Sequence, residues 1–226
     1  MVRVSQCFLA ILLAVAFTNA HAATLYESGT LGPTGVPWSD FTDGTVPGTD
    51  VSTAVFVGVR FFIDQSVTTT RIGGHFVKNT LADNSFFGAI VELDDEHDFP
   101  DSGDLSTSDV VGSTLLTFPE PSDEVFGDLA KQLESGWYAL VFGSGLFGAT
   151  GSGGAVRNGI DIGTPTYIGS QSGADWFNLT DLSDVVEFTN HRFIIEGSMV
   201  PESASLGLLL IAALCFMFRR PVHMGE

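Results

Sequence analysis

Residues 55–63 read Val-Phe-Val-Gly-Val-Arg-Phe-Phe-Ile, and this stretch decides the expected fold class. Every second residue in it is apolar, namely Val55, Val57, Val59, Phe61 and Ile63. Because successive side chains of a β-strand point to opposite faces, these residues share one face. The stretch therefore predicts a strand that turns this face toward a hydrophobic core.

Similar short runs, rich in Val, Phe, Ile and Thr, recur between clusters of Gly, Asp, Ser and Pro, which is the pattern of an all-β protein. Residues 137–142 (WYALVF) form the clearest buried run, and a strand over residues 66–77 is expected to bend or bulge at Gly73-Gly74. Further strands are expected at residues 24–30, 86–93, 110–118 and 191–198, with shorter ones at Tyr167, Trp176-Phe177 and 185–188.

One segment, residues 122–134 (SDEVFGDLAKQLE), is a candidate helix. Ser122 would cap its first turn and Glu124 would suit the helix dipole, whereas Gly127 argues against a long helix. Roughly eight to ten strands bury their apolar faces best as two antiparallel sheets packed together. We therefore predict an all-β fold, an antiparallel β-sandwich of jelly-roll type, with an N-terminal signal helix and a C-terminal transmembrane helix.

Charge and hydrophobicity are distributed unevenly along the chain. The 226 residues include 27 acidic and nine basic residues, a formal net charge of −18, yet the mean hydropathy is +0.28. Residues 23–198 hold 25 of the acids and six of the bases, a net charge of −19. Such a surface repels phosphate backbones, which argues against nucleic acid as a partner. Both cysteines, Cys7 and Cys215, lie outside this middle, which excludes a disulfide scaffold, a Cys metal site and a Cys nucleophile there.

The N-terminal residues 1–22 have the pattern of a secretory signal peptide. Arg3 supplies the positive start, residues 7–17 are an apolar run, and Ala20-His21-Ala22 fits the small-x-small cleavage pattern. Ala20 and Ala22 are thus expected to form the signal-peptidase site. Cleavage after Ala22 leaves a single domain at residues 23–198. An uncleaved first membrane anchor is the alternative.

The C-terminal residues 199–226 have the pattern of a second targeting segment. Val200-Pro201-Glu202-Ser203 leads into the apolar stretch 204–218, which Arg219 and Arg220 follow. Fifteen helical residues rise about 22 Å, at the short edge of what a bilayer accepts. The paired arginines would stay on the cytoplasmic side, so the domain would lie outside the membrane.

This tail resembles the PEP-CTERM sorting signal of secreted bacterial proteins. The resemblance implies that Pro201 and Glu202 are the pair that an exosortase recognises, that residues 204–218 are a transient transmembrane anchor, and that Arg219 and Arg220 are the stop. Two departures are Ser203, where the family has a second proline, and the extension PVHMGE after Arg220. An ordinary single-span anchor is the alternative.

Two internal stretches also resemble segments of many secreted PEP-CTERM proteins. These are residues 136–154 (GWYALVFGSGLFGATGSGG), and VGVRFFI at 57–63 followed by GGHF at 73–76. This likeness implies an extracellular β domain and assigns no activity.

Glycines and acids supply two further motifs. Gly143–Gly148 (GSGLFG) matches G-x-G-x-x-G, but the following ATGSGG cannot start a helix and no βαβ unit surrounds it, so a turn between strands is expected rather than a dinucleotide site. The loop Asp94–Asp98, with Asp101 and Asp104 beyond it, could hold Ca²⁺ through carboxylate oxygens, although the EF-hand order is absent. A solvated acidic loop is the alternative reading.

Catalytic patterns are sparse. There is no G-x-S-x-G elbow, and His75 and His191 lie in expected strands, where packing is the simplest role. We therefore predict no catalytic residue, no cofactor and no metal site. Four aromatic residues are candidates for a sugar platform, with Trp137 expected in the core and Trp176 the best candidate: Trp38, Trp137, Tyr167 and Trp176.

The expected function is that of an exported, non-enzymatic protein that an exosortase-like enzyme sorts and processes. It would be transiently anchored in the membrane and then remain at the cell surface or outside the cell, associated with exopolysaccharide or biofilm matrix. Two alternatives stay open, a secreted carbohydrate-binding module with or without Ca²⁺, and a secreted glycoside-acting enzyme. An ice-binding face built on Thr68-Thr69-Thr70 is a remote fourth.

Overall fold

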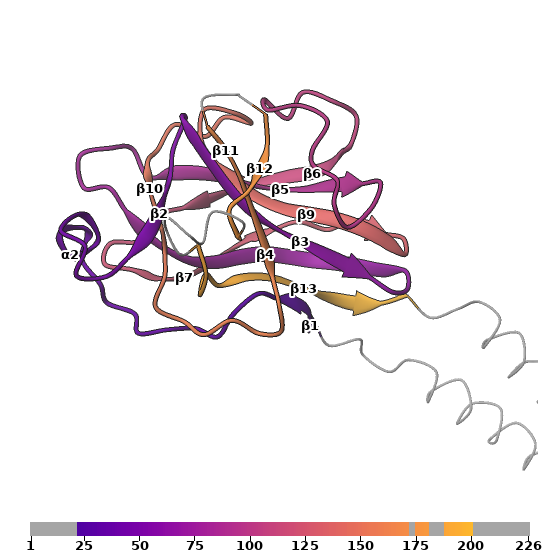
Figure 1. Cartoon of the computed structure of the whole chain (residues 1–226), viewed down its shortest axis with the longest axis horizontal. Coiled ribbons are helices and arrows are strands. Elements are labelled where there is room, and N and C mark those ends of the chain that lie inside the picture. Colours follow the sequence, from indigo (N-terminus) through magenta and orange to yellow (C-terminus); the bar gives the residue numbers. More distant parts are fainter. Residues whose placement is uncertain (1–21, 172–174, 181–187, 201–226) are drawn as a thin grey trace, which may run out of the picture.

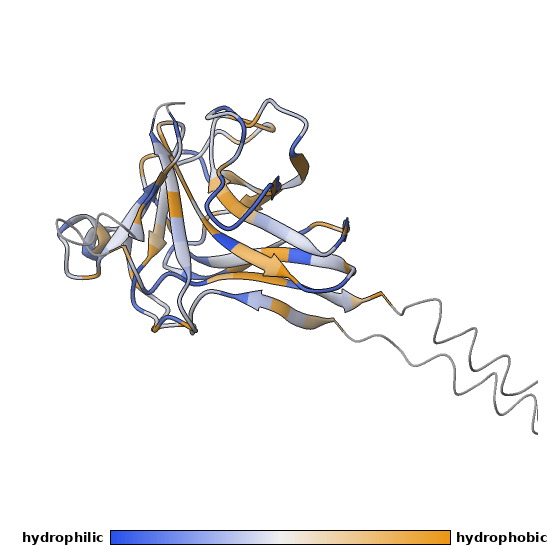
Figure 2. Ribbon diagram, turned by 45° about the vertical axis from the view of Figure 1, so that its right-hand side comes forward, coloured by the Kyte–Doolittle hydropathy of each residue, from blue (hydrophilic) through white to orange (hydrophobic). Residues whose placement is uncertain are grey.

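The computed structural model describes residues 22–171, 175–180 and 188–200, which form an all-β sandwich (Figure 1). The predicted signal helix, the transmembrane helix 204–218, and most of the short strand expected at 185–188 lie outside these residues. Two antiparallel sheets face each other, and Figure 2 shows hydrophobic segments along the strands of both layers. The prediction of an antiparallel β-sandwich is confirmed.

The first sheet is built around the longest strand, β4. Its strands follow the order β1 (Ala23–Glu27), β13 (Phe193–Met199), β4 (Val67–Lys78), β10 (Gly153–Val156) and β2 (Gly48–Val51). Two further strands, β7 (Asp123–Asp128) and β8 (Gln132–Leu133), pair with the edge of β4 that lies opposite to β13. A single long strand thus joins two groups of short ones.

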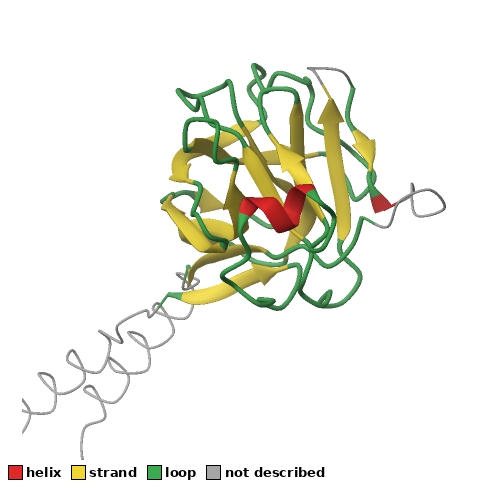
Figure 3. Ribbon diagram, turned by 90° about the vertical axis from the view of Figure 1, so that its left-hand side faces the viewer, coloured by secondary structure: helices red, strands yellow, loops and turns green. Residues whose placement is uncertain are grey.

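The second sheet contains the stretch that predicted the fold. Its order is β12 (Phe177–Asn178), β11 (Thr166–Gln171), β3 (Val55–Ile63), β9 (Gly136–Gly143), β5 (Ser85–Leu93) and β6 (Val110–Thr117). The short helix α2 (Trp38–Thr42) lies at one end of the sandwich, the end that Figure 3 turns toward the viewer.

The main core lies between the two sheets. Val57, Val59, Phe61 and Ile63 of β3 point into it, as the alternation predicted. Phe76 of β4 faces them and contacts four other rings, those of Phe86, Phe118, Phe142 and Phe193. Phe56 of β3 and the alternate residues of β5 and β9 are also apolar, because loops cover the outer face of this sheet with a second cluster that includes Leu105, Ala149 and Trp176.

The predicted helix at residues 122–134 is wrong, because this segment forms β7 and β8. β7 pairs with β4, with Gly127 opposite Ile72, and a Cβ on Gly127 would come within 2.7 Å of the Thr114 side chain. Ser122 caps no helix, since its Oγ instead accepts a hydrogen bond from the Val36 backbone N at 3.0 Å. The exposed hydrogen-bonding edge of β4 supplies partners that outweigh the local helical preference.

The expected bend at Gly73-Gly74 is also placed differently. The register of β4 against β13 shifts between Glu196 and Gly197, opposite Arg71 and Thr69, not at the two glycines. Gly73 and Gly74 serve close approach instead, because a Cβ would lie 2.1 Å from the Val125 carbonyl O and 2.4 Å from the Arg192 carbonyl O respectively.

The helices in the described ranges are too short or too polar for a bilayer span: none of them could cross a membrane.

Candidate functional site

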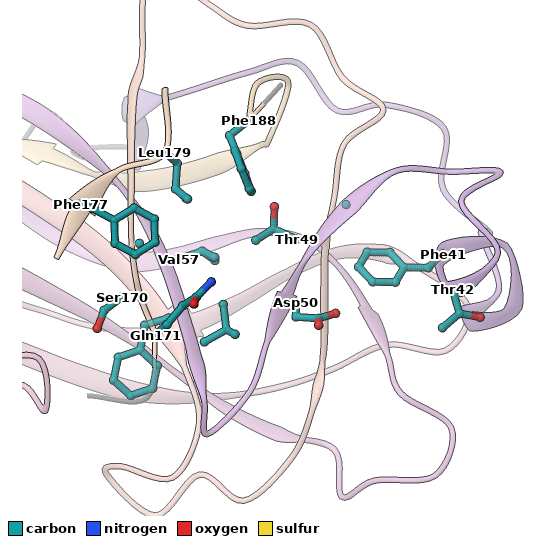
Figure 4. Close-up of a pocket in the computed structure, with 14 residues that line it drawn as sticks. Phe41, Thr42, Thr49, Asp50, Val57, Ser170, Gln171, Phe177, Leu179 and Phe188 are labelled. Atoms are coloured by element: carbon teal, nitrogen blue, oxygen red, sulfur yellow. The ribbon is translucent and has the colours of Figure 1, made fainter. Parts of the chain in front are cut away.

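A cavity of about 500 Å³ lies at one edge of the sandwich, between β2 of the first sheet and β11, β12 and the start of β3 of the second sheet (Figure 4). Its lining is Phe41, Thr42, Gly48, Thr49, Asp50, Val55, Phe56, Val57, Gly169, Ser170, Gln171, Phe177, Leu179 and Phe188. Ligand pockets in proteins range over about 300–1,000 Å³, so the volume suits a small molecule or the end of a polymer.

One wall of the cavity is the ring of Phe41, which α2 presses onto the first sheet. The ring lies over two adjacent glycines, because a Cβ on Gly48 would come 2.0 Å from Phe41 Cε2 and one on Gly154 would come 2.1 Å from Phe41 Cζ. Trp38 stacks on the same ring, with 4.8 Å between the ring centroids and 17° between the planes. Glycines in β2 and β10 therefore make room for an aromatic wall that Trp38 and the sheet hold in place.

The opposite wall is apolar and comes from later in the chain. Phe177, Leu179 and Phe188 point toward the cavity in Figure 4. Leu179 lies against Gly169, where a Cβ would be 3.2 Å from its side chain. A side chain larger than hydrogen at Gly169 would push Leu179 away from the strand.

Five polar side chains complete the lining: Thr42, Thr49, Asp50, Ser170 and Gln171. Asp50 and Gln171 are exposed, whereas Thr49 and Ser170 are buried. Asp50 is the one acidic residue among the described residues that line the cavity, and this lining contains no Lys, Arg or His. The cavity therefore offers hydrogen-bond donors and acceptors without a positive charge.

His191 lies directly behind Thr49, with Nε2 at 3.1 Å from Thr49 Oγ1. Burial, together with the nearby charge of Arg157, lowers the pKa of His191 to about 3. Its ring stacks on Phe193, and its backbone carbonyl contacts Tyr167 Oη at 2.9 Å. His191 is thus a neutral packing residue, as expected, and it reaches the cavity only through Thr49.

His75 is likewise buried, in β4, where its Nε2 lies 3.2 Å from Ser122 Oγ. Burial lowers the pKa of His75 as well. Both His75 and His191 therefore match the packing role that the sequence indicated.

The four aromatic candidates do not form one platform. Burial raises the pKa of Tyr167, and the carboxylate of Asp161 adds to this shift because its Oδ1 lies 2.6 Å from Tyr167 Oη. Trp176 is only 8% exposed, and its Nε1 donates to the Ser102 carbonyl O at 2.9 Å. The prediction that Trp176 is the best sugar contact is therefore wrong, because a loop closes over its ring.

Trp137 was expected in the core but lies on the outer face of its sheet. It is partly buried and contacts Phe62, which is 50% exposed, with 5.2 Å between the ring centroids and 50° between the planes. The two rings border a shallow pocket of about 200 Å³ that also involves Arg60, Thr164 and Thr166. Sequence reasoning missed Phe62, because it counted only tryptophans and tyrosines as surface aromatics.

The acidic loop uses its carboxylates to hold its own backbone. Asp98 Oδ2 accepts from the Asp94 N at 2.8 Å, and Asp95 Oδ1 accepts from the His97 N at 2.7 Å. Across residues 22–171, 175–180 and 188–200, no group of three or more His, Cys, Asp or Glu side chains is placed to hold a metal ion. The loop thus shows turn chemistry and no preformed Ca²⁺ cage.

The glycine motif at Gly143–Gly148 links β9 to β10 as a turn. Gly145 and Gly148 have φ angles of 82° and 88°, a left-handed conformation that glycine adopts without strain. The expectation of a turn between strands is confirmed, and no helix follows that could hold a pyrophosphate.

Most of the predicted processing residues lie outside the described part of the chain. This applies to Ala20, Pro201, Glu202, Arg219 and Arg220, whereas Ala22 is described and exposed. No protein-family model matches the chain, and a search of curated proteins finds no match. Similarity to a characterised protein therefore assigns no role to any residue of the cavity.

Proposed function

We propose that the protein is an exported, non-enzymatic surface protein, delivered by residues 1–22 and by the tail 199–226, and left associated with extracellular polysaccharide. An exosortase-like enzyme would recognise Pro201 and Glu202, and residues 204–218 would hold the chain in the membrane until cleavage. Arg219 and Arg220 would stop translocation.

The observation that carries this proposal is the position of the first and last residues of the folded domain. β1 begins at Ala23, β13 ends at Met199, and the two strands pair with Ala23 opposite Gly197. The last backbone hydrogen bond of this edge runs from the Val200 N to the Ser66 carbonyl O at 3.0 Å. Cuts after Ala22 and near Pro201 would leave every strand of both sheets intact.

We also propose that the sandwich is of jelly-roll type. Eight strands form nested antiparallel pairs, β1 with β13, β3 with β9, β4 with β7, and β5 with β6. Alternate pairs belong to alternate sheets, which gives β1-β13-β4-β7 opposite β3-β9-β5-β6. This nesting is what two interlocked Greek keys produce, and β2, β10, β11 and β12 would be additions to it.

The lining of the cavity supports a binding role over a hydrolytic one. Glycoside hydrolysis uses two carboxyl groups about 5–9.5 Å apart across the scissile bond. Asp50 is the one carboxylate that the described residues contribute to the lining, and no histidine contacts the cavity directly. This composition favours a carbohydrate-binding module over a glycoside-acting enzyme as the second candidate function.

The sorting proposal is tested by the double variant Pro201→Ala and Glu202→Ala, produced in the bacterium that makes the protein. Unaltered chains should appear outside the membrane fraction, with an intact mass that corresponds to cuts near Ala22 and Pro201. The double variant should keep its tail and stay in the membrane fraction. The matched control is Pro221→Ala, beyond the arginine pair, which should be processed normally.

Equal processing of the double variant and the unaltered chain would refute recognition of this pair. A mass that still includes residues 204–218 in the unaltered chain would instead indicate an ordinary single-span anchor.

A further inference from the structure

We propose that the cavity between β2 and β11 binds an uncharged saccharide. This deepens the proposed function, since it names the ligand class that the exported domain would hold and the place where it would hold it. The contacts, the charge and the position of the cavity each support this choice.

The aromatic walls suit the apolar faces of a sugar ring. Phe41 on one side and Phe177 with Phe188 on the other flank the space in Figure 4. Because Trp38 and the two glycines pack against Phe41, its ring is held in place and adds an apolar surface to the wall at little further cost in conformational entropy. Apolar aromatic surface is the part of a site that a pyranose covers with its C–H groups.

The polar lining suits hydroxyl groups. The Gln171 amide both donates and accepts, the Asp50 carboxylate accepts, and the Thr42 hydroxyl, which donates its proton to the Ser39 carbonyl O at 3.0 Å, can still accept. A lipid acyl chain in the same space would remove water from these groups without replacing their hydrogen bonds, which costs about 1–3 kcal/mol for each group. Polar groups between aromatic walls therefore favour a saccharide over a lipid.

The charge selects the kind of saccharide. The cavity is lined by Asp50 and by no cationic side chain of the described residues, and the chain carries a formal net charge of −18. Carboxylate or sulfate groups on a polysaccharide would be repelled both at the site and during approach. An uncharged glycan meets neither penalty.

The cavity also lies away from the end at which the tail leaves the fold. Along β4, Met199 pairs with Val67, whereas Phe76 pairs with Ala155 of β10, which pairs on its other edge with Thr49 of the cavity lining. The nine residue steps from Val67 to Phe76 span about 30 Å of strand. A polymer could therefore reach the cavity while the tail is still in the membrane.

The Phe62–Trp137 pair is the competing site, and its geometry is less suitable. Its two rings are tilted by 50° and make no common flat face. The guanidinium of Arg60, which lines the same pocket, donates to the carbonyls of Glu96 and His97, both at 3.1 Å. This pair therefore serves as the internal control.

The test uses the full chain, purified in detergent, and isothermal titration with defined oligosaccharides. The probes are uncharged β-1,4-glucan, xylan, mannan, chitin and α-glucan fragments, with oligogalacturonate and oligoalginate as anionic comparisons. At least one uncharged oligosaccharide should bind, and raising the salt from 50 to 500 mM should change its affinity less than twofold, because no ion pair forms. Gln171→Ala and Phe177→Ala should each weaken binding at least tenfold.

Two controls keep the outcome decisive. Trp137→Ala should bind within twofold of the unaltered chain, and Gln171→Ala, at an exposed position, should keep the unaltered thermal midpoint even if Phe177→Ala destabilises its edge strand. Binding of none of the uncharged probes, preference for the anionic probes, or loss of binding in Trp137→Ala would overturn the proposal. Because purified chains are used, failure here is separate from failure of sorting, which cell fractionation reports.

Discussion

Lowering the pH from 7.5 to 5.0 is expected to destabilise the fold by about 2 kcal/mol through the single side chain of His191. Its ring is enclosed behind Thr49 and stacks on Phe193. Burial, with the Arg157 charge as a second cause, lowers its pKa to about 3 in the folded state. The folded protein therefore keeps this imidazole neutral throughout the interval.

The size of the effect follows from proton binding in the unfolded state. A solvated imidazole has a pKa of about 6.5, so it changes from roughly one-tenth protonated at pH 7.5 to nearly full protonation at pH 5.0. Because only the unfolded chain binds this proton, its free energy falls relative to that of the folded chain as the pH decreases. Linkage gives about 2 kcal/mol at pH 5.0, and the loss continues toward the folded pKa of about 3.

Urea unfolding followed by tryptophan fluorescence, at pH 7.5, 6.5 and 5.0, measures this dependence. His191→Gln keeps a polar partner for Thr49 and lowers stability at every pH, but it should remove about 2 kcal/mol of the pH-dependent loss. His75, whose pKa burial also lowers, adds a dependence of the same sign. The matched control is His97→Gln, since the His97 side chain is 86% exposed and is solvated in both states.

An equal loss between pH 7.5 and 5.0 in the unaltered chain and in His191→Gln would refute the neutral buried histidine. A changed pH dependence in His97→Gln would show that the acidic loop, and not the core, governs acid sensitivity.

Two further predictions concern packing. Phe76 is fully buried among four rings, so Phe76→Ala should lower the free energy of unfolding by about 3–5 kcal/mol in urea titrations, whereas Phe62→Ala at a half-exposed position should cost under about 1 kcal/mol. In Gly154→Ala the new Cβ would meet Phe41, so this variant should lose about 1–3 kcal/mol and expose the Phe41 segment to limited proteolysis. Gly136→Ala, whose Cβ would have no neighbour closer than 3.8 Å, should match the unaltered chain in both assays.

The strands that were predicted correctly are those whose alternation of apolar residues can be read within the strand itself. The alternation in residues 55–63 reports a period of two, and it identified the core-facing side of β3 before any partner strand was known. Residues 122–134 carried a helix-like start and no clear alternation, so the available edge of β4 decided their conformation. Local propensity could not predict an edge that β4 offers from about fifty residues earlier in the chain.

The candidate site was less predictable, because exposure depends on which loops cover a sheet face. Trp176 and Phe62 are both aromatic and both near strand ends, yet a loop carbonyl holds the Trp176 indole inside while Phe62 stays half exposed. In the sequence, Phe41 is one residue of a turn-rich stretch with no sign of a special role. In the fold its ring packs against Gly154, which lies more than a hundred positions later in the chain.

By itself the sequence determined an all-β class and a strongly acidic middle without cysteines, and it predicted an export signal and a sorting signal in the two terminal segments. These features follow from composition and short-range periodicity, which act within a few residues. Only the tertiary structure decided the nesting of the strands, the burial of His191, and the cavity whose walls come from α2, β2, β3 and β11. Each of these depends on contacts between residues far apart in the chain, and the free energy of those contacts becomes available only when both sheets have formed.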